Sequence, residues 1–545
     1  MKPIVHIFAM AAAACVAMTA AAGPDPVVRS PAGLVRGVAK DGVHVFKGLP
    51  YALAPVGDRR WRPPEPMPPW PGERSARQFG PPCYQPKSRP GSIYAEELPA
   101  MSEDCLSLNL WAPAHARNAP VIVWIHGGAL VTGWSGDGLY DGTAVARRGV
   151  VLVSVNYRLG VLGFLAHPGL SAESADGVSG NYGLLDQIAA LRWVRNNIAA
   201  FGGDPTNVTI AGESAGALSV MYLLASPPAR GLFARAIIQS AYMISTPELR
   251  ESRFGEIPAE TAGMTLATKV GASDLAALRA MAPDTLTDAA VRAGFATFGT
   301  IDGHTLPRQL ADTFDRGEQA KVPLLAGFND GEIRSLRFLA PPVPADAPTY
   351  TREIRDRYAD LADAFLALYP ASNLAESVLQ APRDAIYGWT AERLVRKQTA
   401  LGVSAFLYYF DHGYPAADTA GLHAFHASEI PYVFGTADRV PPLWPKAPAE
   451  AADVRLSEAM TAYWAAFARD GAPVAPGQPR WPPYGGDRAY MAFADVPRPG
   501  THLLPGMYEL NEQVVCRRRA NGAIPWNWNI GIVSPPLPAE VPGCR

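Results

Sequence analysis

The sequence predicts an α/β fold, with a central, mostly parallel β-sheet that is flanked by helices. Short aliphatic and β-branched runs, typical of strands buried on both faces, recur along the chain. Segments with apolar residues every three or four positions, typical of helices, alternate with these runs. The chain has 545 residues, of which 48% are hydrophobic and 18% charged, and this composition supports a large core and argues against disorder.

Predicted strands and helices alternate along the chain, both before and after a turn at residue 214. The expected strands are 43–46, 102–111, 120–125, 149–157, 208–210, 234–239, 322–326 and 403–410, and the expected helices are 186–201, 217–224 and 456–468. Segments 247–314 and 336–400, the second with a proline-rich stretch at 341–348, interrupt this alternation. We expect them to be insertions that form a lid or a pocket wall.

Residues 1–22 have the composition of a secretory signal peptide. Lys2 provides a positive start, residues 4–18 are apolar and rich in alanine, and small residues precede Gly23. We expect cleavage near Ala22, export to the periplasm or the medium, and one catalytic domain over residues 23–545. Cys15 weakly resembles a lipoprotein site but lacks the usual leucine three positions earlier. No later stretch is long and apolar enough to span a bilayer.

Four cysteines remain after residue 22, and an even number in an exported chain predicts disulfides. Pairing nearest neighbours closes the shortest loops, so we expect Cys83–Cys105 and Cys516–Cys544. A four-cysteine zinc site would need a C-x-x-C spacing, which the sequence lacks. The net charge of −2 does not indicate a nucleic-acid-binding protein or a polybasic membrane patch.

The pentapeptide Gly212-Glu213-Ser214-Ala215-Gly216 stands between a predicted strand and a predicted helix. This is the context in which G-x-S-x-G forms a nucleophile elbow, a tight turn that exposes the serine hydroxyl. The two glycines leave room for the turn. The helix that follows directs the backbone N–H of Ala215 toward the position of a developing oxyanion. Glu213 is expected to support the nucleophile electrostatically or structurally.

A serine nucleophile also needs an oxyanion site, a base and an acid. The loop His126-Gly127-Gly128-Ala129 follows a buried strand and can provide N–H donors. On residue type and position alone, His426 and His423 both qualify as the base, and Asp330 and Glu332 both qualify as the acid. His423, His426 and Glu429 could instead bind a metal, but Pro431 disfavours the long helix that this spacing requires.

With these motifs the chain resembles the type-B carboxylesterases, the cholinesterase and carboxylesterase branch of the α/β-hydrolases. The resemblance covers nearly all of residues 23–545. Its markers are Phe46-Lys-Gly-Leu-Pro-Tyr-Ala52, Ser102-Glu-Asp-Cys-Leu106, Trp124-Ile-His-Gly-Gly128, Val155-Asn-Tyr-Arg158, Leu162-Gly-Phe164, Asn181-Tyr-Gly-Leu-Leu-Asp-Gln187, Phe201-Gly-Gly-Asp-Pro205, Gly212-Glu-Ser-Ala-Gly216 and His426-x-x-Glu-Ile-Pro-Tyr432.

The resemblance implies a catalytic triad of Ser214, Glu332 and His426 in a cofactor-free hydrolase of small-molecule esters. It places the oxyanion donors on Gly128, Ala129 and Ala215, supported by His126 and Gly127, and it supports Cys83–Cys105. Ala129 replaces the third glycine of the usual H-G-G-G; it keeps the N–H, but its methyl group narrows the pocket. The acid loop, Asn-Asp-Gly-Glu-Ile, lacks the glycine that often follows the acid in the family.

Three alternatives are an amidase or peptidase on the same fold, a catalytically inactive binding ectodomain and the metal enzyme. The physiological ester cannot be read from the sequence. Pocket-lining candidates close in sequence to the catalytic loops are Trp134, Tyr242, Arg334 and Phe425, of which Arg334 could recognise an anionic acyl group.

Overall fold

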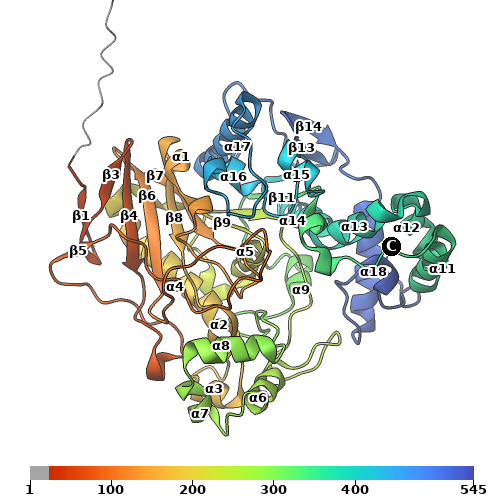
Figure 1. Cartoon of the computed structure of the whole chain (residues 1–545), viewed down its shortest axis with the longest axis horizontal. Helices are drawn as coiled ribbons and strands as arrows, with labels where there is room; N and C mark the ends of the chain where they lie inside the picture. The colour runs from red at the N-terminus through yellow and green to blue at the C-terminus, as the bar shows by residue number, and fades with distance from the viewer. Residues whose placement is uncertain (1–23, 545) are drawn as a thin grey trace, which may run out of the picture.

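The computed structural model describes residues 24–544, so the predicted signal peptide, with its lipoprotein-like Cys15, lies outside them. A sheet of eleven strands in the order β14-β13-β12-β11-β10-β9-β7-β8-β6-β4-β3 crosses the molecule (Figure 1). Its strands are β3 (Val38–Lys40), β4 (Val43–Pro50), β6 (Ser107–Pro113), β7 (Ala119–Ile125), β8 (Val151–Val155), β9 (Gly203–Glu213), β10 (Arg235–Gln239), β11 (Leu324–Asn329), β12 (Ala405–Phe410), β13 (Ala489–Phe493) and β14 (Pro497–Thr501). A separate small sheet contains β1 (Val27–Ser30), β2 (Gly33–Arg36) and β5 (Glu73–Ser75).

The strands from β8 to β13 pair in parallel, and antiparallel pairs stand at the two ends of the sheet. The prediction of a mostly parallel α/β sheet is therefore confirmed. Strand β6 begins at Ser107, later than predicted, because residues 102–105 belong to an irregular segment that ends at a disulfide. Strands β13 and β14 were not predicted.

Helices cover both faces of the sheet, and side chains that alternate along the strands enter two hydrophobic cores. In β7, Val121, Val123 and Ile125 join one core, whereas Ile122 and Trp124 join the other. The first core contains α4 (Tyr182–Asn197), α5 (Ala215–Ala225) and α14 (Trp389–Ala400). The second contains α1 (Thr143–Arg147), α16 (Ile430–Phe434) and α17 (Ala451–Asp470). Burial on both faces explains the uninterrupted apolar runs in the sequence.

Two helical groups extend from this framework. One group lies at the bottom of Figure 1 and is made of α3 (Pro168–Glu173), α6 (Ala259–Lys269), α7 (Leu275–Ala280) and α8 (Pro283–Arg292), next to α2 (Gly160–Phe164). The other lies at the right and is made of α11 (Ala347–Tyr358), α12 (Ala362–Leu368), α13 (Leu374–Arg383) and α18 (Met507–Asn521). Each group has its own apolar cluster. The remaining α-helices of the described residues are α9 (Leu310–Asp315), α10 (Glu332–Ser335) and α15 (Pro415–Thr419), and the π-helix η8 (Asp384–Gly388) precedes α14.

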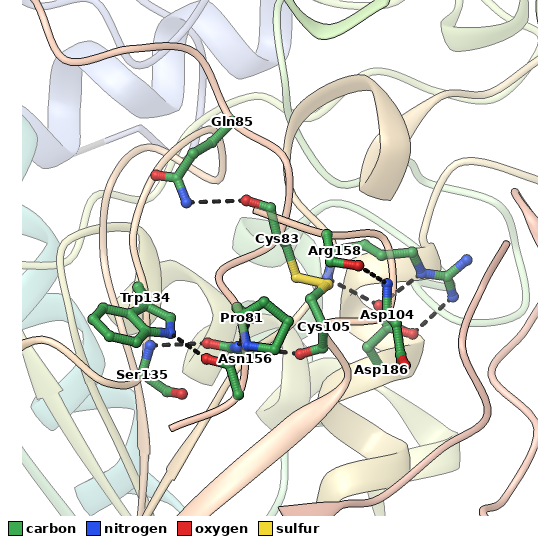
Figure 2. Close-up of a disulfide and its surroundings, with 12 residues drawn as sticks. Pro81, Cys83, Gln85, Asp104, Cys105, Trp134, Ser135, Asn156, Arg158 and Asp186 are labelled. Carbon is green, nitrogen blue, oxygen red and sulfur yellow. Dashed lines mark hydrogen bonds and ion pairs between the residues drawn. A yellow bond between two sulfur atoms is a disulfide. The ribbon is translucent and has the colours of Figure 1, made fainter. Parts of the chain in front are cut away.

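Both expected disulfides are formed, Cys83–Cys105 and Cys516–Cys544. They close loops with sequence separations of 22 and 28, and a cross-link of this span typically stabilises a fold by about 3 kcal/mol. Figure 2 shows the first disulfide beside Asn156, whose side-chain amide donates hydrogen bonds to the carbonyls of Pro81 and Cys105. Within residues 24–544 no helix has the length and apolarity needed to cross a membrane.

Candidate active site

Ser214 occupies the sharp turn between β9 and α5, with a φ of 55°. Its backbone N–H donates to the carbonyl of Gln239 at the end of β10. A Cβ on Gly216 would lie 2.0 Å from the carbonyl oxygen of Ile125, and one on Gly212 would lie 2.5 Å from the carbonyl carbon of Gly216. These distances are far below any real contact, so both glycines are required for β7, β9 and α5 to approach one another. The predicted strand, tight turn and helix are present.

The loops after β11 and β12 bring Glu332 and His426 together. Gly331 pairs with Phe425 in an isolated parallel bridge, and its N–H donates 2.8 Å to the carbonyl of Ala424. His426 Nδ1 is hydrogen-bonded to Glu332 Oε2. The other carboxylate oxygen, Oε1, accepts a 2.8 Å hydrogen bond from the backbone N–H of Asn329. Glu332 is fully buried, so its carboxylate has a fixed orientation toward one imidazole nitrogen.

The second imidazole nitrogen, Nε2, lies 3.1 Å from Glu213 Oε1. The two groups form a buried pair in which the charge of each stabilises the charged form of the other. For His426, burial favours the neutral ring, but the carboxylates of Glu213 and Glu332 outweigh burial and raise its pKa to about 9. A histidine with a raised pKa is charged below that value, so the two carboxylates favour the imidazolium at neutral pH.

A third carboxyl group, Glu429, lies behind this pair and is completely buried. Its Oε1 accepts a 2.8 Å hydrogen bond from Gln239 Nε2, and its Oε2 accepts a 2.6 Å hydrogen bond from Asn329 Nδ2. Burial raises its pKa despite the bond from Asn329. The side-chain amides of Gln239 and Asn329 thus connect the ends of β10 and β11 to Glu429, three residues after His426.

The loop after β7 lies against the elbow. A Cβ on Gly127 would be 3.2 Å from the Cβ of Ser214, which places this backbone beside the serine. Gly128, Ala129 and Leu130 have φ values of 97°, 57° and 60°. Among residues 24–544, no acceptor takes a hydrogen bond from the N–H groups of Gly128, Ala129 or Ala215, the last at the first turn of α5. His126 stacks on Tyr157, and burial lowers its pKa to about 4, so this ring is neutral.

The rival acid and the rival base occupy other positions. Asp330 forms a 2.6 Å ion pair with Arg383. The two ring nitrogens of His423 each lie 2.9 Å from a carboxylate, one from Asp411 and one from Asp418, and these bonds raise its pKa to about 9 despite burial. Neither side chain contacts the Glu332–His426 pair. In the part of the chain that the structure describes, His423, His426 and Glu429 do not form a metal-binding group.

Residues 24–505 match the Carboxylesterase family. The chain belongs to this family.

Curated relatives of this carboxylesterase agree with the family match. It is 37% identical over 489 residues to a fumonisin B1 esterase of Sphingopyxis macrogoltabida, with 86% of each chain covered. It is 36% identical over 478 residues to a para-nitrobenzyl esterase of Bacillus subtilis, covering 84% of this chain and 92% of that one.

Solved structures confirm the α/β-hydrolase fold. A structure of a para-nitrobenzyl esterase superposes with a TM-score of 0.76 at 33% identity, covering 89% of this chain and 99% of the other. A carboxylesterase of Geobacillus stearothermophilus superposes with a TM-score of 0.72 at 34% identity and the same coverage. The protein is therefore a carboxylic ester hydrolase of the serine-hydrolase type.

The pocket candidates of this carboxylesterase have different surroundings. Trp134 donates a hydrogen bond to the Gly80 carbonyl and packs edge-on against Phe79, and Phe425 is buried against Trp444. Arg334 forms a 2.6 Å ion pair with Glu376, so its charge is already matched. Tyr242 is half-buried and packs edge-on against Tyr387 of the π-helix, whose ring lies 5.3 Å from that of His426. Of the four candidates, Tyr242 is thus linked to the ring of His426 through a neighbouring ring.

Sequence reasoning missed several residues that hold this site together. Tyr387, Gln239 and Asn329 occur within ordinary strand or helix patterns, and Tyr94 occurs in a segment without periodicity. Glu429 was visible only as part of the His426-x-x-Glu spacing. Each acts through a contact with a distant segment, and no local pattern encodes such contacts.

Proposed function

We propose that the carboxylesterase cleaves small-molecule esters through an acyl-enzyme intermediate on Ser214. His426 takes the proton of the Ser214 hydroxyl and later donates it to the leaving alcohol, and Glu332 orients the imidazole and stabilises its charged form. N–H groups of Gly128, Ala129 and Ala215 bind the tetrahedral oxyanion, and removal of one such donor typically costs about 10²–10³-fold in kcat. Water then repeats the sequence on the acyl-enzyme.

The observation that carries this proposal is the hydrogen bond that His426 Nδ1 donates to the buried Glu332 carboxylate, on loops beside the Ser214 elbow. The other ring nitrogen, Nε2, lies 3.1 Å from Glu213 Oε1 and is the one that we expect to exchange the proton with Ser214. This arrangement supports Ser214 as nucleophile, His426 as base and Glu332 as acid, with unpaired N–H donors beside them, which are the groups that ester cleavage needs. We also propose that residues 1–22 direct export, that residues 23–545 are one catalytic domain, and that segments 247–314 and 336–400 help to shape the pocket.

The direct test is covalent labelling by an organophosphate. The active protein should lose esterase activity in step with a single phosphoryl adduct, which peptide mass spectrometry should locate at Ser214. An adduct at another residue, or full activity after complete labelling of Ser214, would contradict the assignment. A para-nitrobenzyl ester is a sensible first substrate, given the names of the relatives. A matched butyryl ester and amide would separate an esterase from an amidase.

The Glu213 contact predicts an unusual pH profile. General-base catalysis needs the neutral imidazole, so kcat/KM should rise with pH through an apparent pKa above the ordinary histidine value of about 6.5. Glu213→Gln removes one of the charges that raise the pKa of His426, so the same rise should move to lower pH. The measurement is kcat/KM for an aryl ester from pH 5 to 10. An unchanged profile in Glu213→Gln would mean that Glu213 does not set the proton affinity of His426.

A further inference from the structure

The Cys83–Cys105 disulfide closes the base of an irregular segment, residues 84–104, which we call the disulfide loop. Its first residues are tied to the loop that carries the unpaired N–H donors. Gln85 Nε2 donates a 2.9 Å hydrogen bond to the Gly133 carbonyl, and the Gly133 N–H donates a 2.8 Å bond back to Gln85 Oε1. Gly133 packs directly against the His126 ring, since a Cβ there would lie 2.2 Å from Nδ1. The disulfide loop therefore starts from a fixed base beside the loop of the unpaired N–H donors. Figure 2 shows the disulfide and the bond from Gln85 to the Cys83 carbonyl.

The middle of the disulfide loop reaches the opposite half of the site through Tyr94. The Tyr94 hydroxyl lies 2.9 Å from the backbone carbonyl oxygen of His426 and 2.8 Å from Oγ of Ser335, three residues after Glu332. A phenol has one proton, so it donates to the carbonyl while it accepts from the Ser335 hydroxyl. Its ring packs edge-on against Trp444, with 5.6 Å between ring centroids. One side chain thus contacts the segments of both the base and the acid.

The carbonyl that Tyr94 contacts belongs to a strained part of the backbone. Ala427, directly after His426, has a φ of 70°, which a residue with a Cβ adopts only at an energetic cost. Within residues 24–544, no backbone N–H donates to the His426 carbonyl, and Tyr94 is the side chain that does. Burial raises the pKa of Tyr94 well above its usual range, so the phenol stays a donor at working pH.

We propose that Tyr94 is a positioning residue for the catalytic base and that the disulfide loop acts on turnover through it. Anchored at Cys83–Cys105 and at Gly133, the loop holds the His426–Ala427 peptide in its strained conformation and thereby fixes the imidazole relative to Ser214. This proposal rests on the proposed function, because it takes His426 as the base.

The first test is Tyr94→Phe, which keeps the ring and removes the hydrogen bond. We expect kcat for a small aryl ester to fall about tenfold while KM changes less than about twofold, since a misplaced base slows chemistry without weakening substrate binding. Tyr350→Phe is the matched control, because its hydroxyl donates to the Tyr369 carbonyl in the α11–α12 group, away from the site. An unchanged kcat in Tyr94→Phe, or an equal loss in the control, would overturn the proposal.

The second test asks whether the loop works through Tyr94. Replacing both Cys83 and Cys105 by serine should lower kcat of the native enzyme. In the Tyr94→Phe enzyme the same replacement should lower kcat by less than about a further twofold, because both changes release the same contact. Equal losses in the two backgrounds would overturn the coupling. Gln85→Ala provides the same comparison if the serine variant does not fold. Replacing Cys516 and Cys544 by serine is the control and should leave kcat unchanged.

Failure of this proposal can be told apart from failure of the proposed function. If Ser214 carries the organophosphate adduct but Tyr94→Phe turns over normally, only the positioning role is wrong. If Ser214 is not labelled in the active enzyme, the assignment of the site is wrong.

Discussion

Ser214→Ala and His426→Ala should each lower kcat/KM for a simple aryl ester by about 10⁴-fold or more, because nucleophile and base act as one unit. The double variant should be little worse than either single variant, since the second change removes a group that no longer has a partner. Initial rates with a 4-nitrophenyl ester, on protein checked for native circular dichroism, measure these losses. Additive losses in the double variant would contradict a shared mechanism.

His423→Ala is the matched control for His426→Ala. The two histidines are three residues apart, but His423 bonds to Asp411 and Asp418 instead of to Glu332. We expect His423→Ala to keep kcat/KM within about threefold of the native value, because only surface ion pairs are lost. A loss as large as that of His426→Ala would reverse the assignment of the base.

Gly128→Ala should lower kcat by about 10²–10³-fold, the loss expected when an oxyanion donor is displaced. The added Cβ would lie 2.2 Å from the Thr132 carbonyl oxygen, and the φ of 97° at this position disfavours any side chain. The loop must therefore shift, and the N–H groups of Gly128 and Ala129 shift with it. The measurement is steady-state kinetics with a small ester, because hydrolysis of a small ester does not depend on the size of the pocket.

Gly149→Ala separates backbone strain from loss of the donors. Gly149 has a comparable φ of 84°, but no atom lies within 4 Å of an added Cβ there. It lies just before β8, outside the loops that carry Ser214, Glu332 and His426. It should lower the melting temperature slightly and leave kcat unchanged. If both glycine variants lost activity in proportion to stability, the oxyanion assignment of the loop would lose its support.

The framework could be predicted from the sequence because each central strand is buried on both faces. The run Pro120 to Ile125 needs no alternation to be a strand, and the structure places it in β7 with neighbouring side chains in opposite cores. The elbow could be predicted for a related reason. A side chain at either of its glycines would clash with backbone atoms a few residues away or in β7. The short G-x-S-x-G pattern is therefore enough to predict the turn.

The proposed acid and base were harder to identify from the sequence, because each choice depends on partners that lie far away in the sequence. Asp330 and Glu332 occupy one turn, and a local reading cannot rank them. The structure separates them through Arg383, which pairs with Asp330, and through His426, which bonds to Glu332. The family resemblance implies the same two residues, and their mutual hydrogen bond, which is visible only in three dimensions, supports the proposal.

Other features had no sequence signal at all. Strands β13 and β14 are short, and β14 contains two prolines within Pro497–Thr501, which suits an edge strand but argues against a strand when read locally. The contact of Tyr94 with His426 joins residues 332 positions apart. A half-buried tyrosine in an irregular segment does not reveal such a contact.

The strand order of the central sheet has a consequence for folding. The proposed oxyanion loop follows β7, the elbow follows β9, and the proposed acid and base follow β11 and β12. These groups therefore come together only when strands from both halves of the chain have paired in register. Contacts of such long sequence separation form slowly and late. Catalysis should therefore recover in step with the last cooperative phase of refolding, and no partly folded intermediate should hydrolyse an ester.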